Sequence, residues 1–104
     1  MPVRRVRRRY LLFRVVSDRR CGGREIADAV RESVFRLYGL HGLSQVEPVI
    51  IEFDEEDQRG ILRCSHRHLR QMRASLAYIT SIGGSAASIH VLRASGTIRA
   101  LRSS

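Results

Sequence analysis

Three side chains that could bind a metal or act in nucleophilic catalysis lie close together, as Cys64, His66 and His68. A thiolate and two imidazoles are typical zinc ligands, and a cysteine beside a histidine can form a nucleophile and its base. Structural zinc sites usually pair their ligands at short spacing on both sides of a loop, and Cys21 lacks such a neighbour. We therefore expect no metal site, and Cys64 is more simply a buried strand residue.

The remaining titratable residues form no recognised catalytic motif. No nucleophile elbow, Walker phosphate loop or HEXXH sequence accompanies the other two histidines, His41 and His90. Five carboxylates between Glu52 and Asp57 could bind magnesium, but acidic residues in a turn are far more often solvated. We expect no catalytic residue in this chain and no hydrolase activity from it alone.

The arginines carry the chemistry that the sequence favours. The chain has 104 residues, all 19 of its basic residues are arginines, and its formal net charge is +9. A guanidinium group binds phosphate through two parallel hydrogen bonds and stacks on bases, so an all-arginine basic surface suits nucleic acid. The alternative is a genome or growth temperature that favours arginine codons, and composition does not separate the two explanations.

The charge alternates in sign along the chain. Residues 1–24 hold nine arginines and one acidic residue. Residues 25–57 hold two arginines and nine acidic residues, and residues 58–104 hold eight arginines and no acidic residue. Basic surface therefore comes from both ends of the chain, and such surface recruits phosphate backbones and releases their counterions. We predict RNA contacts at ten arginines, which are Arg4, Arg5, Arg7, Arg8, Arg9, Arg63, Arg67, Arg70, Arg73 and Arg99.

Length and composition indicate one domain with a modest core. With 43% hydrophobic residues the chain is too apolar to be disordered, and no stretch of about 18 apolar residues could span a membrane. The N-terminal apolar run is broken by Arg14 and lacks a cleavage site, so we expect no signal peptide. Two cysteines are too few for a disulfide framework, and we expect reduced, buried thiols in a cytoplasmic protein.

Hydrophobic periodicity predicts the order strand, helix, strand, strand, helix, strand. This is the order of a ferredoxin-like, RRM-like split βαβ sandwich, with two helices on one face of a four-stranded antiparallel sheet. We predict a basic N-terminal arm over 1–8 and a single α+β domain over 9–104. The predicted strands are 9–16, 46–53, 60–64 and 88–93, the helices are 24–40 and 66–82, and a short helix follows over 97–101.

The second face of the predicted sheet is also apolar. Leu12 and Ile50 are expected to point away from the helices, although a sheet with water on one side should be polar there. Either the C-terminal helix folds back over this face or a partner protein covers it. We predict protein contacts at Leu12 and Ile50, and at Phe35 on the outer side of the first helix.

Base stacking of the RRM type is not expected. An RRM carries aromatic residues in a strand that opens with a basic residue and glycine. Here Arg59 and Gly60 are followed by Ile61, Leu62 and Arg63. Any RNA binding would therefore depend on phosphate contacts and shape.

Five sequence blocks resemble the ribonuclease P protein component 2 family of archaea and eukaryotes. They are RYLL at 9–12, VRESV at 30–34, YGL and GL within 38–43, RGILR at 59–63, and LR and SGTIR within 92–99. The blocks follow the order and spacing of that family over nearly the whole chain. The chain departs from the family in lacking lysine and in carrying Arg14 where members often have an acidic or apolar residue.

The resemblance implies a role in removing the 5′ leader of precursor tRNA. In that enzyme the RNA and its magnesium ions are the catalyst, so this chain would be a non-catalytic subunit that binds no cofactor. The resemblance further implies pairing with the thirty-kilodalton ribonuclease P protein, component 3, and self-association within a heterotetramer. The short chain is typical of archaeal members. Two alternatives stay open, a small ferredoxin-like hydrolase and a protein-interaction module with no RNA role.

Overall fold

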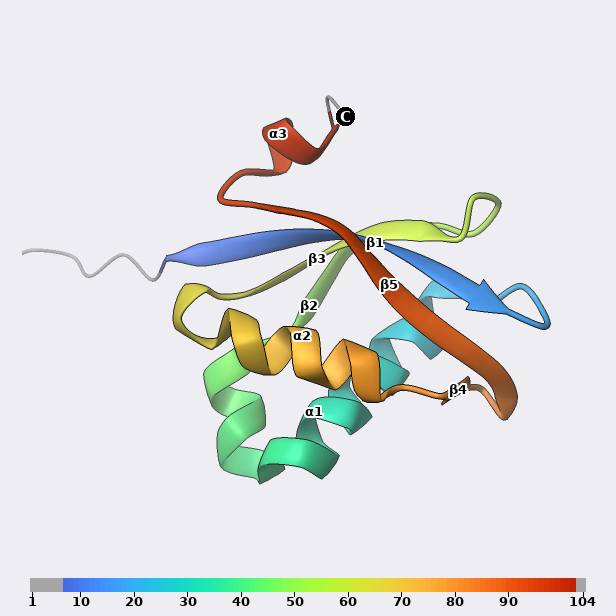
Figure 1. Ribbon diagram of the computed structural model, residues 1–104, viewed down its shortest axis with the longest axis horizontal. Coiled ribbons are helices and arrows are strands. Elements are labelled where there is room, and N and C mark those ends of the chain that lie inside the picture. The colour runs from blue at the N-terminus through green and yellow to red at the C-terminus, as the bar shows by residue number, and fades with distance from the viewer. Residues whose placement is uncertain (1–6, 103–104) are drawn as a thin grey trace, which may run out of the picture.

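The computed structural model describes residues 7–102 as an α+β protein with helices on both faces of one sheet (Figure 1). Its elements are β1 (Arg8–Ser17), α1 (Gly23–Val46), β2 (Val49–Asp54), β3 (Arg59–Ser65), the 3-10 helix η1 (His66–His68), α2 (Leu69–Tyr78), β4 (Ser81–Ile82), β5 (Ser85–Ser95) and α3 (Ile98–Arg102). The strands pair antiparallel in the order β2-β3-β1-β5-β4. Helices α1 and α2 cover one face of the sheet, and α3 lies over the other.

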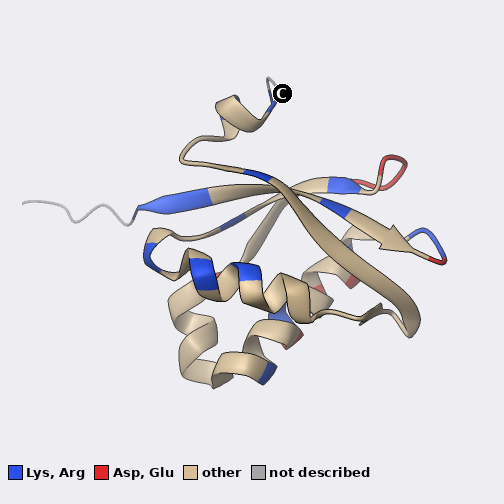
Figure 2. Ribbon diagram, viewed as in Figure 1, with Lys and Arg blue, Asp and Glu red and all other residues tan. Residues whose placement is uncertain are grey.

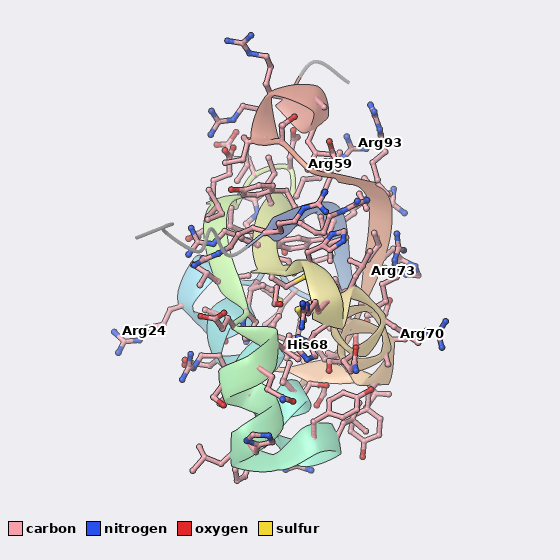
Figure 3. All side chains as sticks on the ribbon, turned by 90° about the vertical axis from the view of Figure 1, so that its left-hand side faces the viewer. Arg24, Arg59, His68, Arg70, Arg73 and Arg93 are labelled. Carbon is pink, nitrogen blue, oxygen red and sulfur yellow. The ribbon has the colours of Figure 1, made fainter. Side chains whose placement is uncertain are left out.

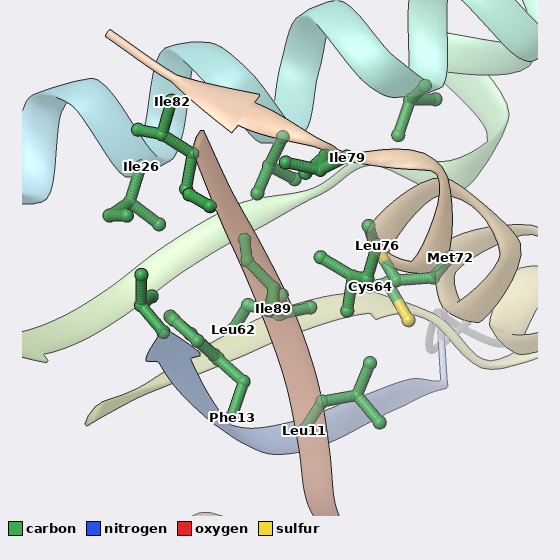
Figure 4. Packing of buried hydrophobic residues seen from close by; sticks show 14 of the residues in the cluster. Leu11, Phe13, Ile26, Leu62, Cys64, Met72, Leu76, Ile79, Ile82 and Ile89 are labelled. Carbon is green, nitrogen blue, oxygen red and sulfur yellow. The ribbon is translucent and has the colours of Figure 1, made fainter. Parts of the chain in front are cut away.

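The core lies between the sheet and the two longer helices (Figure 4). Leu11 and Phe13 of β1 are fully buried, because alternate side chains of a strand point to the same face. Met72 and Leu76 of α2, one helical turn apart, are buried against them. Hydrophobic periodicity predicts apolar stripes of Ile26, Val30, Ser33, Val34 and Leu37 on the first helix and of Leu69, Met72, Leu76 and Ile79 on the second. These residues are buried or packed against the core, except Leu37, which is 38% exposed, and Ile79 follows the end of α2.

Helix α1 continues beyond its predicted end at residue 40. Gly39 has φ 73° and ψ −173°, which interrupts the regular helix, but the chain resumes helical geometry as far as Val46. Glycine tolerates this positive φ because it has no side chain to clash with the backbone. The predicted end of this helix at residue 40 is therefore wrong, since Gly39 makes a kink instead of an end.

Helix α2 ends at Tyr78 instead of continuing to residue 82 as predicted. Ser81 and Ile82 form the short strand β4, which pairs with Ala86 and Ser85 of β5. Between these strands Gly83 and Gly84 have φ of 58° and 83°, as a tight hairpin turn requires. The predicted count of four strands is therefore wrong, and the sheet has five.

An irregularity in β2 changes the face on which Ile50 lies. The register of β2 against β3 shifts between Ile50 and Glu52, which leaves Ile51 without a partner. Ile50 pairs with Leu62 and packs against the core, whereas Glu52 pairs with Ile61. The prediction that Ile50 lies on the second face is wrong, because a bulge of one residue reverses the alternation of side chains.

Helix α3 covers the middle of the second sheet face. Leu101 is 2% exposed and Ile61 is 3% exposed, although neither belongs to the main core cluster. Leu12, the register partner of Ile61, is partly buried in the same row. An ion pair between Arg102 and Glu52 joins α3 to β2. The C-terminal helix therefore folds back over this face, which was the first of the two alternatives.

Candidate nucleic-acid interface

One end of the sheet gathers arginines from several elements, as the blue segments of Figure 2 show at the start of β1 and along η1 and α2. Arg8 and Arg9 open β1, and their register partners in β3 are Ser65 and Cys64. Because β3 runs directly into η1 and α2, the helical arginines begin beside the first residues of β1. We call this set the basic end; its members are Arg7, Arg8, Arg9, Arg63, Arg67, Arg70 and Arg73.

A backbone hydrogen bond fixes the start of β1 against η1. The N–H of His66 donates to the carbonyl of Arg7 at 3.0 Å. The predicted N-terminal arm to residue 8 is therefore too long, since Arg8 is already the first residue of β1. Arg4 and Arg5, which were also predicted to contact RNA, lie outside the described residues.

Two members of the basic end have a buried guanidinium nitrogen, and they lie on opposite faces of the sheet. Arg9 shares the core-side face with its partner Cys64, whereas Arg63 pairs with Tyr10 on the face that carries α3. The Nε atoms of both arginines are buried and have no hydrogen-bond partner within residues 7–102. A buried donor without an acceptor is costly, so both arginines are held in place at a cost in stability.

The helical arginines of the basic end are exposed and carry uncompensated charge. Arg70 and Arg73 project from the same side of α2 (Figure 3). No member of the basic end forms an ion pair with an acidic side chain in the described part of the chain, where the ion pairs are Arg19–Glu25, Arg36–Glu32 and Arg102–Glu52. Such a field concentrates anions at this surface.

Cys64 lies beneath the basic end as a protonated thiol. Burial raises its pKa to about 11, a larger effect than the opposing influence of Arg9 and Arg73. The thiolate that nucleophilic attack or zinc binding requires is therefore scarce at neutral pH. His68 Nδ1 lies 3.2 Å from the hydroxyl of Ser65. Across residues 7–102 no three His, Cys, Asp or Glu side chains group as a metal site would need, and both cysteines are free and buried.

The other predicted contact residues lie apart from the basic end. Arg99 is exposed on α3, over the second sheet face. Phe35 lies on α1, and 51% of it is exposed to solvent. Leu12 is partly covered by α3 and Ile50 packs toward the core, so these two offer little area to a partner protein.

Three arginines that were not predicted as contacts come together on the second sheet face. Arg14 of β1 is the register partner of Arg59 in β3, and Arg93 of β5 lies in the adjacent row opposite Leu12. All three arginines are exposed. This cluster could not be found without the strand register, because its arginines come from three strands. The sequence signal was the position of Arg14 between two residues expected to be buried in the same strand.

No helix in the described part of the chain is long and apolar enough to cross a membrane.

The model of a family described as Rpp14/Pop5 matches residues 9–104. The chain is 37% identical to "Ribonuclease P protein component 2" of Pyrococcus furiosus, over 97% of this chain and 84% of that protein. The chain is also 36% identical to the protein of the same name from Methanosarcina mazei, over 95% of this chain and 84% of that protein. Among solved structures, a chain of yeast ribonuclease MRP, determined by cryo-electron microscopy, has a similar fold, with a TM-score of 0.73 and 17% identity over 92% of this chain and 79% of that one.

Proposed function

Because the chain belongs to the Rpp14/Pop5 family, we propose that it is a non-catalytic subunit of ribonuclease P that binds and supports the catalytic RNA during 5′ leader removal from precursor tRNA. Relatives named as component 2 of that enzyme support this role. The RNA and its magnesium ions perform the cleavage in this proposal. The protein contributes no catalytic group and binds no cofactor, and it resides in the cytoplasm with the RNA.

The observation that carries the RNA-binding role is the basic end. Its arginines have no acidic partners among residues 7–102, and two of them hold buried Nε donors without acceptors. Phosphate oxygens would neutralise the charge of the exposed guanidinium groups and accept hydrogen bonds from them. Because β3 presents Ile61 and Arg63 where an RRM presents stacking aromatics, the contacts position the RNA backbone without reading its sequence.

The fold is best classed, in our proposal, as an extended ferredoxin-like, RRM-like sandwich. The strand order β2-β3-β1-β5 is the one expected of that plan, with α1 and α2 on one face. Strand β4 adds a short fifth strand beside β5.

The partner protein in this proposal is the thirty-kilodalton subunit, component 3, docked on α1, with two such pairs forming a heterotetramer. Phe35 is 51% exposed, Tyr38 about one turn further along α1 is 38% exposed, and Leu40 after the kink is 73% exposed. Leu40 also lines a shallow hollow with Leu43 and other residues after the kink of α1. Exposed apolar side chains gathered on one element are typical of protein interfaces. This surface replaces Leu12 and Ile50 as the expected contact.

Reconstitution with the catalytic RNA and component 3, with leader cleavage as the readout, tests the function. The informative pair of double variants is Arg70→Gln with Arg73→Gln, and the charge-matched control Arg20→Gln with Arg24→Gln. Arg24 points away from the basic end (Figure 3). The first variant should reduce the magnitude of the negative slope of log affinity against log salt by roughly 1.4, because each single-strand phosphate contact contributes about 0.7.

The control variant should leave that slope and the cleavage rate close to those of the wild type. Equal slopes for both variants would contradict RNA binding at the basic end. Leader cleavage by the isolated protein would instead support the hydrolase alternative. A complex whose affinity does not change with salt would support the alternative of a protein-interaction module.

A further inference from the structure

Basic residues from three adjacent strands meet on the second sheet face, in a row that α3 leaves open. Arg14 of β1 is the direct register partner of Arg59 in β3 and of His90 in β5. Side chains paired in this way share a face and have Cβ atoms about 4.5–5.5 Å apart. Arg93 lies on the same face in the neighbouring row, opposite Leu12. We call Arg14, Arg59, His90 and Arg93 the distal cluster.

The distal cluster is on the side of the sheet opposite to the helical arginines. Leu11, Phe13 and Val15 of β1 are buried in the core, so Arg14 between them points away from it. Figure 3 shows Arg59 and Arg93 toward α3, whereas Arg70 and Arg73 extend from α2 beneath the sheet. The distal cluster is therefore a separate basic surface from α2.

The distal cluster has acidic neighbours in the turn between β2 and β3, but among residues 7–102 none of them forms an ion pair with its arginines. Asp54 is the β2 partner of Arg59, but its Oδ1 accepts the backbone N–H groups of Glu56 and Asp57 at 2.9 and 3.2 Å. In the next row Glu52 is paired with Arg102. Over residues 7–102, none of the three arginines of the cluster has an ion pair.

Like charges directly opposite each other in an antiparallel pair destabilise the sheet. Arg14 and Arg59 have this arrangement in the free protein. An anion between two guanidinium groups would turn their repulsion into two charge-assisted contacts. The arrangement thus costs stability in the free protein and favours binding of an anion.

We propose that Arg14, Arg59 and Arg93 form a second phosphate-binding site, which holds a segment of RNA backbone separate from the segment at the basic end. The choice of RNA as the occupant rests on the proposed function and on the charge of both surfaces. Because Arg70 and Arg73 extend from the helix side of the sheet and the distal cluster lies on the other side, the protein would hold two segments of the folded RNA on either side of β1.

The test compares three double variants of the full chain, each assembled with the catalytic RNA and component 3. They are Arg14→Gln with Arg59→Gln, Arg70→Gln with Arg73→Gln, and the control Arg20→Gln with Arg24→Gln. The distal variant should reduce the magnitude of the negative slope of log affinity against log salt by roughly 1.4. Combining it with the α2 variant should reduce that magnitude by roughly twice as much. Hydroxyl-radical footprinting should show one protected RNA segment lost in the distal variant and a different one lost in the α2 variant.

The melting temperature of the free protein separates a binding role from a structural one. At low salt the distal variant should melt roughly 1–4 °C above the wild type, because a like-charge repulsion has been removed. A second variant, Arg14→Lys with Arg59→Lys, keeps the charge and should keep the salt slope, while its affinity falls because lysine lacks the guanidinium fork.

Two results would overturn the second site. One is a distal variant with the salt slope and the RNA footprint of the wild type, while the α2 variant has a smaller slope and lacks a protected segment. That result would leave the proposed function intact. The other is a lower melting temperature in the free distal variant, which would make the arginine pair a structural feature. If neither variant alters RNA binding, the RNA-binding role itself fails together with this inference.

Discussion

Ser33 of α1 donates a hydrogen bond of 2.6 Å to the backbone carbonyl of Ser75 in α2, and both residues are buried. Ser75 lies in the last turn of α2, where carbonyl groups lack partners within the helix. The bond therefore completes the end of α2 and joins it to α1. Because α2 carries Arg70 and Arg73, this contact also helps to hold them in place.

Replacement of Ser33 by alanine should lower the free energy of unfolding by about 1–2 kcal/mol, because the carbonyl of Ser75 is left buried without a donor. Urea unfolding of the isolated protein measures the change. The control is Ser44→Ala, which removes an exposed hydroxyl bonded to the carbonyl of His41 at 2.7 Å. The control should cost less than about 0.5 kcal/mol. Equal losses in the two variants would show that the buried bond contributes nothing of its own.

Helix α3 should be held on the sheet chiefly by Leu101. The side chain is 2% exposed, so Leu101→Ala should cost about 2–3 kcal/mol of α3 docking and speed tryptic cleavage after Arg99 and Arg102. Leu40→Ala removes the same atoms from a side chain that is 73% exposed and serves as the control. Equal cleavage rates in wild type and Leu101→Ala would contradict the docking of α3, and a partner protein would then have to cover Leu12.

Periodicity was sufficient for the parts of the fold in which one face of an element is buried. Leu11 and Phe13 of β1, and Met72 and Leu76 of α2, lie in the core as their spacing predicts. The prediction failed where backbone geometry, and not the side-chain pattern, decides the outcome. The kink at Gly39 and the short strand β4 are examples, and the bulge after Ile50 is another.

The arginines of the site could be found from the sequence, but their arrangement could not. Arg9 and Arg73 are far apart in the chain, and both lie close enough to Cys64 to lower its pKa. That convergence depends on the register between β1 and β3, which is a non-local property. The same register brings Arg14 opposite Arg59. A sequence pattern shows the face of each residue on its own strand, and it does not show which residue lies opposite on the next strand.

Stability should depend on acid pH through Glu25. Hydrogen bonding from Arg19, followed by the N–H of Gly22, lowers the pKa of Glu25 from 4.5 to about 2. Since the folded pKa is below the unfolded one, the ionised carboxylate stabilises the protein above about pH 4.5, and this contribution is lost as the pH falls toward 2. Glu25→Gln should therefore lower the melting temperature at pH 6, and the difference from wild type should shrink steadily below pH 4.5.

The control for this pH series is Glu32→Gln, which removes an exposed ion pair with Arg36 within α1. Exposed pairs of this kind contribute little, so the control should follow the wild type across the series. A melting-temperature difference between Glu25→Gln and wild type that is as large at pH 2 as at pH 6 would contradict the lowered pKa of Glu25.

The thiol of Cys64 should be inert in the folded protein. Its pKa is raised to about 11 and its side chain is fully buried, so both the thiolate fraction and the access of a reagent are low. At pH 8 a thiol-specific chromogenic reagent should modify Cys64 only after denaturant is added, in a Cys21→Ala background that leaves one thiol to follow. Cys64→Ser and His68→Ala should each leave leader cleavage by the reconstituted enzyme within a few-fold of wild type. Rapid modification of the native protein, together with a loss of several orders of magnitude in cleavage, would instead identify Cys64 as a nucleophile or metal ligand beneath the basic end.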